Sequence, residues 1–348
     1  MITDDTLREG MQAPGIAFSP KEKVDLAEAI HKCGIERMLF SYPSAHSSEE
    51  ESIRLLQNKK IFKELYGLGR AIREDIDKIY STGAMISLHF PFQYKSLDQV
   101  YEDIAYAVSL GQMVEVSVID ITQYSIESLV KIVNKLSEIG VQTIQLPDTM
   151  GKATPELIRR VVSAAKRQKN SEIGVHCHND RGTSIANAIA GVEAGADHVD
   201  ATFLGIGERN GITDMISISS YMNERGMETE LNMKEMVKFS RNLFDIIVKK
   251  AGIEFFAKNI PNIGENIGVH TAGTHAAFGD VFHGSNYSVN VYTGRSMLEK
   301  ILNQSGIVLD KEKMKKLMKL VKDRSAEEGR VILANEIVME AKGFVQGN

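Results

Sequence analysis

The sequence predicts an α/β fold, a closed (β/α)8 TIM barrel followed by a mainly helical C-terminal subdomain. Eight short apolar runs rich in β-branched residues recur up to residue 203, and helical patterns lie between them. Their number and even spacing favour a closed barrel over a doubly wound open sheet. No glycine-rich phosphate-binding fingerprint follows the first run, which also weighs against the open sheet.

The predicted strands share short apolar runs in which β-branched residues are frequent. In chain order they are 1–4, 37–40, 66–70, 85–90, 114–120, 143–147, 174–178 and 198–203. Between them, segments such as 20–34 and 154–168 have apolar residues at helical spacing. Thr154 before Pro155 is a typical helix start. Four glycines that precede strands are predicted helix C-caps: Gly34, Gly83, Gly140 and Gly195.

The pattern changes after the eighth strand. Residues 230–252 predict one long helix, residues 259–280 are rich in glycine, asparagine and histidine, and residues 311–344 are helical and highly charged. We therefore expect a TIM-barrel catalytic domain at 1–252 and a helical C-terminal subdomain at 253–348.

Composition limits the class of protein. The 348 residues carry a formal net charge of -5, so no basic surface for nucleic acid is expected. Two cysteines, Cys33 and Cys177, exclude a disulfide framework and suit a reducing compartment. The N-terminal "MITDDTLREG" lacks the basic and apolar segments of a signal peptide, and no apolar stretch is long enough to span a bilayer. The expectation is a cytoplasmic protein without a membrane or nucleic-acid partner.

Two histidines end the seventh predicted strand. Because strand side chains alternate between faces, His176 and His178 share one face and Cys177 lies on the other. Two imidazoles one pleat apart can chelate one ion, and Glu9 after the first strand is the natural third ligand. The alternative is a pair of hydrogen-bonded core histidines that bind nothing.

Other polar residues follow the predicted strands, where barrel enzymes carry their sites. Arg8 beside Glu9 is either a surface ion pair or, with Gln12, part of a carboxylate-binding rim. Asp148 and Thr149 form either a simple turn or a place where a hydroxyl donates to a substrate carboxylate. "HTAGTHAA" (270–277) holds two histidines that are either structural or available as a general acid or base.

Five segments in order resemble the DRE-TIM metallolyase superfamily and, within it, the branch of homocitrate synthases and 2-isopropylmalate synthases. They are "DDTLREGMQ" (4–12), "LPDTMGKATP" (146–155), "HCHND" (176–180), "EAGADHVDATFLGIGERNG" (193–211) and "HTAGTHA" (270–276). "GIGERNGIT" (205–213) is similar to homocitrate synthases. Related lyases that cleave hydroxymethylglutaryl-CoA carry a cysteine in this glycine loop, where this chain has Glu208 and Arg209.

The resemblance implies an acyltransferase of amino-acid biosynthesis that performs a Claisen-type condensation. Acetyl-CoA loses a methyl proton, its carbanion attacks the ketone of a 2-oxo acid, and hydrolysis releases CoA and a 2-hydroxy diacid. One divalent ion (Zn²⁺, Mn²⁺ or Mg²⁺) would be held by Glu9, His176 and His178. The resemblance also implies the residues that contact the substrate: Arg8, Gln12, Ser117 and Thr149.

The resemblance further implies that the second histidine of "HTAGTH", His275, is a general acid or base. In the family this histidine reaches the barrel of the neighbouring subunit, which implies a homodimer in which the C-terminal subdomain supplies dimer and lid contacts. Tyr287 would assist His275, although its spacing does not match that of the family tyrosine.

Three positions depart from the family pattern. Ile119 replaces a glutamate of the acid–base relay. Glu115 replaces the arginine with which homocitrate synthases read the distal carboxylate of 2-oxoglutarate, and it would repel that carboxylate. Ile212 stands where isopropylmalate synthases usually have asparagine. We therefore expect a non-standard 2-oxo acid with a smaller or apolar side chain. The alternatives are a metal-dependent C–C lyase of the HMG-CoA lyase or aldolase type and an inactive metabolite-binding homologue.

Overall fold

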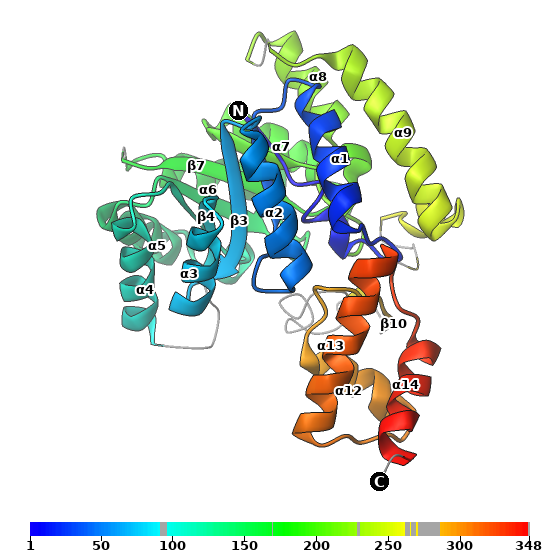
Figure 1. Ribbon diagram of the computed structural model, residues 1–348. Coiled ribbons are helices and arrows are strands. Elements are labelled where there is room, and N and C mark those ends of the chain that lie inside the picture. The colour runs from blue at the N-terminus through cyan, green and yellow to red at the C-terminus, as the bar shows by residue number, and fades with distance from the viewer. Residues whose placement is uncertain are drawn as a thin grey trace.

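Eight parallel strands close into a barrel in the order β1 to β8, and β1 pairs with β8 (Figure 1). The computed structural model describes residues 1–90, 96–168, 170–227, 230–261, 265, 269–270 and 286–346, with only the main chain at 269–270, 286 and 345–346. The strands are β1 (Ile2–Asp4), β2 (Arg37–Ser41), β3 (Glu64–Arg70), β4 (Met85–Phe90), β5 (Val114–Val118), β6 (Thr143–Asp148), β7 (Glu172–Cys177) and β8 (His198–Ala201). The predicted TIM barrel is confirmed.

Helices cover the outside of the barrel and continue beyond it. They are α1 (Pro20–His31), α2 (Ser47–Lys59), α3 (Arg73–Ser81), α4 (Leu97–Ser109), α5 (Ile126–Ile139), α6 (Pro155–Ala165), α7 (Ser184–Glu193), α8 (Met215–Glu224), α9 (Met233–Ala251), α10 (Glu254–Lys258), α12 (Arg295–Gln304), α13 (Lys311–Glu328) and α14 (Ala334–Gln346). A two-stranded sheet pairs β9 (Val269–His270) with β10 (Asn286–Tyr287). The single helix predicted over 230–252 is α9.

Local sequence signals explain several element ends. Thr154 caps α6 by accepting the amide hydrogen of Leu157, and Pro155 is the first helical residue, as predicted. Gly140 ends α5 with φ 98°, a conformation that side chains rarely adopt. The fifth strand ends at Val118 rather than at Asp120, because Asp120 has φ 50° and starts a short 3₁₀ turn.

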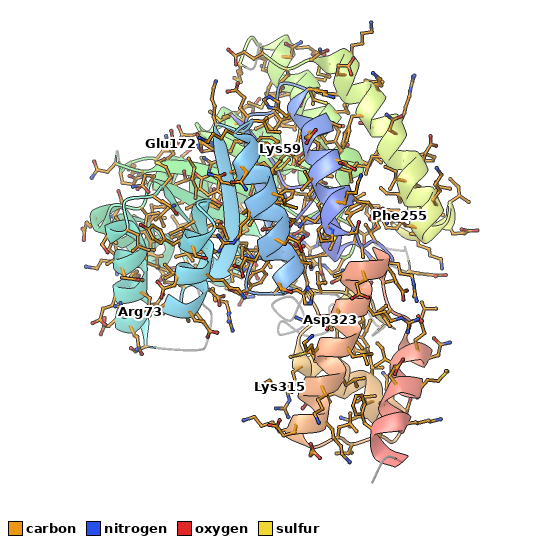
Figure 2. The ribbon with its side chains drawn as sticks, in the orientation of Figure 1. Lys59, Arg73, Glu172, Phe255, Lys315 and Asp323 are labelled. Atoms are coloured by element: carbon orange, nitrogen blue, oxygen red, sulfur yellow. The ribbon has the colours of Figure 1, made fainter. Side chains whose placement is uncertain are left out.

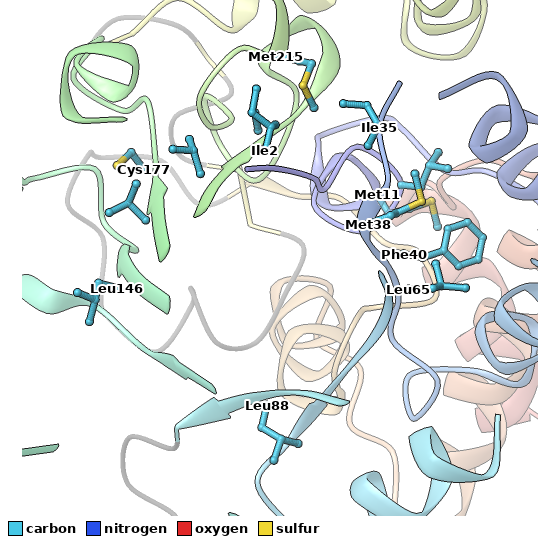
Figure 3. Packing of buried hydrophobic residues seen from close by; sticks show 14 of the residues in the cluster. Ile2, Met11, Ile35, Met38, Phe40, Leu65, Leu88, Leu146, Cys177 and Met215 are labelled. Atoms are coloured by element: carbon cyan, nitrogen blue, oxygen red, sulfur yellow. The ribbon is translucent and has the colours of Figure 1, made fainter. Parts of the chain in front are cut away.

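The main hydrophobic core lies between the barrel strands and the surrounding helices. Figure 3 shows Leu88, Leu146 and Cys177 projecting from the outer face of their strands. Inside the barrel, only a small separate cluster of buried apolar side chains is found among the described residues, formed by Leu39, Tyr66 and Leu68. The rest of the inner face carries many polar groups, and this contrast places the chemistry inside the barrel.

The C-terminal helices form a lobe beside the barrel (Figure 1). α12, α13 and α14 enclose a second hydrophobic cluster that includes Leu298, Leu317 and Ile337. Asp323 lies at the end of α13 nearer the barrel (Figure 2), and its carboxylate is 2.9 Å from His46 Nε2. The division of the chain at residue 252 stays a prediction.

Residues 288–293 connect the lobe to the loop that follows β1. Asn290 Nδ2 donates to the carbonyl oxygen of Met11 at 2.5 Å, and the amide of Gly15 donates to Ser288 Oγ at 3.2 Å. The side chain of Tyr292 belongs to the main core rather than to the C-terminal cluster. Val289 belongs to the C-terminal cluster instead, so this segment packs against both the barrel and the lobe.

A buried ion pair accepts a hydrogen bond from this same segment. Lys23 on α1 donates to both carboxylate oxygens of Glu49 on α2, at 2.9 and 2.7 Å, and Tyr292 Oη donates to Glu49 Oε2 at 2.8 Å. The amide of Tyr42 also donates to Glu49. The side chains of Lys23, Glu49 and Tyr292 are all buried, so removing one of them would leave a buried polar group without its partner and lower stability.

Asp4 at the end of β1 is a second buried group that links distant segments. It accepts hydrogen bonds from the amide and the hydroxyl of Thr6, and that hydroxyl accepts the amide hydrogen of Phe203. Burial raises the pKa of Asp4 to about 7, against its ordinary 3.8, although the bonds from Thr6 oppose the shift.

Within the described residues, no helix combines the length and the apolar character needed to cross a membrane.

Replacing Tyr292 by phenylalanine should lower the free energy of unfolding by about 1.5–3 kcal/mol, because a buried hydrogen bond to a carboxylate is lost. Urea unfolding followed by circular dichroism measures this loss. Tyr80→Phe is the control, since Tyr80 is 43% exposed and the loss of its hydroxyl should change stability by less than ~0.5 kcal/mol. Equal effects of the two substitutions would contradict the importance of the Glu49 contact.

Asp4 should make the stability of the chain depend on pH. Because its folded pKa is raised, the folded state binds more protons between about pH 4 and pH 7, and stability falls as pH rises through this window. Relative to Asp4→Asn, which cannot titrate, the native chain should lose about 4 kcal/mol between these limits. Denaturant titrations of both proteins at several pH values give this difference; a constant difference would exclude the shift.

Candidate active site

A cavity of about 40 Å³ opens at the carboxyl ends of the barrel strands. Every strand except β3 contributes to its wall, either directly or through the loop that follows the strand. The lining residues are Arg8, Glu9, Gln12, Leu39, His89, Ser117, Ile119, Pro147, Thr149, His176, His178 and Asp200. Seven residues predicted from the sequence as metal ligands or substrate contacts therefore share one cavity: Arg8, Glu9, Gln12, Ser117, Thr149, His176 and His178.

The three predicted metal ligands lie together. Glu9, His176 and His178 each offer a ligand atom, and these atoms lie within 4.8 Å of one another. All three residues are buried, and the two imidazole centroids are 5.1 Å apart. One carboxylate and two imidazoles form a donor set that suits a divalent transition metal ion. Metal binding by this set stays a prediction.

The carboxylate of Glu9 is held on both oxygens. Oε1 accepts the amide hydrogen of Glu208 at 2.8 Å, and Oε2 accepts from Arg8 Nη1 at 2.7 Å. Gly207 permits this approach, because a Cβ there would lie 2.8 Å from Glu9 Oε1. The glycine-rich loop after β8 therefore fixes the orientation of a carboxylate that follows β1.

The imidazole of His176 is oriented by the neighbouring strand, and the main chain of His178 is held by the loop after β8. His176 Nδ1 lies 3.1 Å from Asp200 Oδ2 on β8, so Nε2 is the nitrogen available to a metal ion. His178 lies at the end of β7, where it pairs as an isolated bridge with Ile212. The amide of Asn179 donates to the carbonyl of Gly211 at 2.9 Å, which ties the two loops together.

Arg8 is not a surface residue. Its side chain donates to both oxygens of Asp5 and to Glu9, and the residue is only 6% exposed. These contacts use three of the five N–H groups of a guanidinium, which leaves one on each terminal nitrogen. The alternative of a solvent-exposed Arg8–Glu9 ion pair is therefore wrong, and Arg8 places a fixed positive charge beside the predicted ligands.

Asp148 and Thr149 have different surroundings. Thr149 Oγ1 accepts the amide hydrogen of Asp120 at 2.9 Å, so its own hydroxyl hydrogen can be donated to another acceptor. Asp148 instead accepts the amide hydrogens of Lys152 and Ala153. Burial raises the pKa of Asp148 to about 6 against these hydrogen bonds. Thr149 thus lines the cavity, while Asp148 holds the turn that follows β6.

Sequence reasoning missed two polar residues of the cavity, His89 on β4 and Asp200 on β8. Burial, and then the positive charge of Arg8, lower the pKa of His89 to about 3, so its imidazole is neutral. Strand alternation places both residues on the inward face of a predicted strand, but it does not give their level along the barrel, which decides whether they line the cavity.

Two of the residues that depart from the family pattern, Ile119 and Glu115, lie in different places. Ile119 lines the cavity and offers an apolar surface. Glu115 does not line the cavity but lies deeper in the barrel, where Arg37 Nη2 donates to it at 2.6 Å. Ser87 Oγ and Gln145 Nε2 also donate to Glu115, at 2.8 and 3.2 Å. The expected repulsion of a substrate carboxylate by Glu115 is therefore offset by a paired arginine.

The two remaining predicted residues are His275 and Tyr287. His275 lies outside the described residues. Tyr287 packs against the C-terminal hydrophobic cluster, and the ammonium group of Lys300 lies 6.0 Å from the centroid of its ring. Catalytic roles for His275 and Tyr287 stay predictions.

The chain is similar to a family of known proteins over most of its length. The profile of the HMGL-like family matches residues 1–243. The chain is similar to 2-isopropylmalate synthase of Sulfurisphaera tokodaii, with 31% identity over 97% of this chain and 95% of that enzyme. It is 30% identical to 2-isopropylmalate synthase of Methanocaldococcus jannaschii over 89% of this chain, but spans only 64% of that enzyme. Homocitrate synthase AksA of the same organism is 30% identical over 79% of this chain and 70% of that enzyme.

Solved structures share the architecture at low sequence identity. An HMG-CoA lyase from Brucella melitensis matches 70% of this chain and 97% of its own with a TM-score of 0.60 and 18% identity. The carboxyl transferase domain of Rhizobium etli pyruvate carboxylase, solved with pyruvate and biocytin, matches 99% of this chain and 60% of its own, with a TM-score of 0.63 and 13% identity. These likenesses support the fold alone.

Replacing His178 by alanine should weaken binding of Mn²⁺ or Zn²⁺ by at least ~100-fold, the upper end of the effect of changing an outer-shell partner. Calorimetric titration of metal into chelator-treated protein measures the affinity. His31→Ala, on α1 and away from the cavity, is the matched control and should bind as the native chain does. Unchanged affinity in His178→Ala would remove His178 from the ligand set.

Proposed function

The chain belongs to the HMGL-like family, in the branch of 2-isopropylmalate and homocitrate synthases, and we propose that it condenses acetyl-CoA with a 2-oxo acid. The ketone carbon of the oxo acid gains a bond to the acetyl methyl carbon, and water cleaves the thioester. The products are a 2-hydroxy diacid, free CoA and a proton. The observation that carries this proposal is the cavity in which Glu9, His176 and His178 meet Arg8 and Thr149.

The residues around the three predicted ligands suit a 2-oxo acid. A divalent ion bound by Glu9, His176 and His178 would supply Lewis acidity toward the ketone oxygen. Arg8 keeps two N–H groups beyond its bonds to Asp5 and Glu9, and these can stabilise negative charge that develops on that oxygen. The hydroxyl of Thr149 can donate its hydrogen to the substrate carboxylate, because Asp120 already supplies the donor to its oxygen.

The wall of the cavity favours an oxo acid with a short, uncharged side chain. Leu39, Ile119 and Pro147 supply apolar surface, and the imidazole of His89 is neutral. Among the described lining residues, Arg8 is the one lysine or arginine, and two of its contacts are already carboxylates. A second carboxylate at the far end of the substrate would therefore find no charge partner in this wall.

The acid–base step needs a group from outside the described cavity wall. Ile119 has no proton to transfer, so the methyl proton of acetyl-CoA must go to another group. We assign this role to His275, assisted by Tyr287 and contributed by the second subunit of a homodimer. The support for this assignment is the resemblance of "HTAGTHA" (270–276) to the family segment.

One assay tests the reaction. The metal-loaded full chain is mixed with acetyl-CoA and, in turn, pyruvate, 2-oxobutanoate, 2-oxoisovalerate and 2-oxoglutarate, and free thiol is followed. Thiol release is expected with a neutral oxo acid, much less with 2-oxoglutarate, and none after chelation. Silence across the panel together with cleavage of a 3-hydroxyacyl-CoA would establish the lyase alternative instead. Silence in both assays, with no stoichiometric metal bound, would establish an inactive metabolite-binding homologue.

The substitution Thr149→Val should raise the KM for the oxo acid by about 10- to 100-fold, because a hydrogen bond to a charged group is lost. Steady-state kinetics at saturating acetyl-CoA give this value. Thr154→Val changes the same residue type at the N-cap of α6; it should cost about 1 kcal/mol of stability and leave KM unchanged. A KM for Thr149→Val equal to that of the native enzyme would remove Thr149 from the substrate site.

A further inference from the structure

A chain of buried polar contacts runs beneath the cavity and ends at one of the predicted metal ligands. From His176 Nδ1 it passes to Asp200 Oδ2 at 3.1 Å, and Asp200 Oδ1 accepts from Gln145 Nε2 at 3.0 Å. The same nitrogen of Gln145 donates to Glu115 Oε2 at 3.2 Å. Since an amide nitrogen carries two hydrogens, Gln145 can make both bonds at once.

Arg37 closes the chain at its lower end. Its Nη2 donates to Glu115 Oε2 at 2.6 Å, and its other nitrogens bond Thr3 and Tyr66. The five members of the chain come from five different strands and are at most 7% exposed: Arg37, Glu115, Gln145, His176 and Asp200. Water therefore has little access to replace a lost contact, and each member is fixed by its neighbours.

A single glycine makes room for the central amide. Gly174 precedes His176 on the inward face of β7. A Cβ at Gly174 would overlap Oε1 and Cδ of Gln145 and would lie 2.6 Å from its Nε2. The space directly below the imidazole of His176 is therefore reserved for the Gln145 side chain.

His176 has a second carboxylate within reach. Asp5 Oδ2 lies 3.8 Å from the same Nδ1 atom, but Asp5 is engaged by Arg8. Gln145 favours the contact with Asp200, because it holds one oxygen of Asp200 while the other faces the imidazole. Without Gln145, Asp200 would lose its hydrogen-bond donor from below, and the imidazole could turn toward Asp5.

We propose that Gln145 is a positioning residue for the metal centre, and that the Arg37–Glu115 pair anchors it so that Asp200 holds His176 in one orientation. This inference rests on the proposed function, because it requires that His176 bind a metal ion. It also gives Glu115 a role in this chain, namely to hold the support of a ligand rather than to read the substrate. The placement of Asp200 and Gln145 behind a ligand matches the outer-shell carboxylates that fix metal-bound histidines.

The first test is the substitution Gln145→Met in the full chain, which keeps the volume and removes both hydrogen bonds. The affinity for Co²⁺ and Mn²⁺ should fall by about 10- to 100-fold. The visible absorption spectrum of the Co²⁺-loaded protein should change, because the orientation of one ligand changes. Gly174→Ala should act in the same direction by displacing the amide.

Asp75→Asn is the matched control. Asp75 is a fully buried carboxylate bonded to the main chain and guanidinium of Arg70, at the start of α3. Its substitution perturbs a buried ion pair without touching the chain beneath His176. Metal affinity and Co²⁺ spectrum should equal those of the native protein, even if the melting temperature falls.

A double-mutant cycle tests whether Gln145 acts through Asp200. Asp200→Asn should weaken metal binding, and adding Gln145→Met to it should cause little further loss. Fully additive losses would overturn the proposed path, and native affinity and spectrum in a folded Gln145→Met would overturn the role of Gln145. These readouts are independent of the reaction: tight metal binding by the native chain without thiol release would refute the proposed condensation and leave the positioning role standing.

Discussion

The site depends on the closure of the barrel by hydrogen bonds between β1 and β8. The register pairs Thr3 with Asp200, so the loop after β1 lies directly beside the strand that orients His176. β7 pairs with β8 on the other side. Glu9 and the two histidines are far apart in the sequence, and only this closure brings a carboxylate from one end of the barrel to imidazoles from the other. An open sheet of the same strands would leave them at opposite edges.

Buried charge is concentrated on the inner face of this closed sheet. Arg8 is bonded to Asp5 and Glu9 at the upper level, and Arg37 is bonded to Glu115 and Glu64 below. Burying such pairs costs desolvation energy that their attraction only partly returns, so they add little net stability. Removing one partner would leave an unpaired buried charge, however, which is strongly destabilising. Each of these carboxylates is therefore held next to its arginine. The apolar contacts between strands and helices supply the stability that the interior does not.

The order and type of the barrel elements could be predicted because the strands are apolar on the face that packs against helices. The inward face of each strand could also be predicted, and His176 and His178 were correctly placed on the same face. The level of a residue along the barrel could not be predicted, because it depends on the register between strands. His89 lies level with Ser117, and Pro147 with His176, only through hydrogen bonding between neighbouring strands. For this reason His89 and Asp200 were missed and Glu115 was expected to act on the substrate carboxylate.

The hydrogen bonds between residues 288–290 and the loop after β1 affect the order in which parts of the chain can fold. Met11 and Gly15 obtain these partners only when a segment more distant in sequence than the whole barrel has been synthesised and docked. Contacts of such long sequence separation form late in folding, because closing the intervening loop is entropically costly. A nascent barrel can thus close its sheet on the ribosome while the loop that carries Arg8, Glu9 and Gln12 still lacks its final support. Acquisition of a bound ion would then follow the folding of the C-terminal segment.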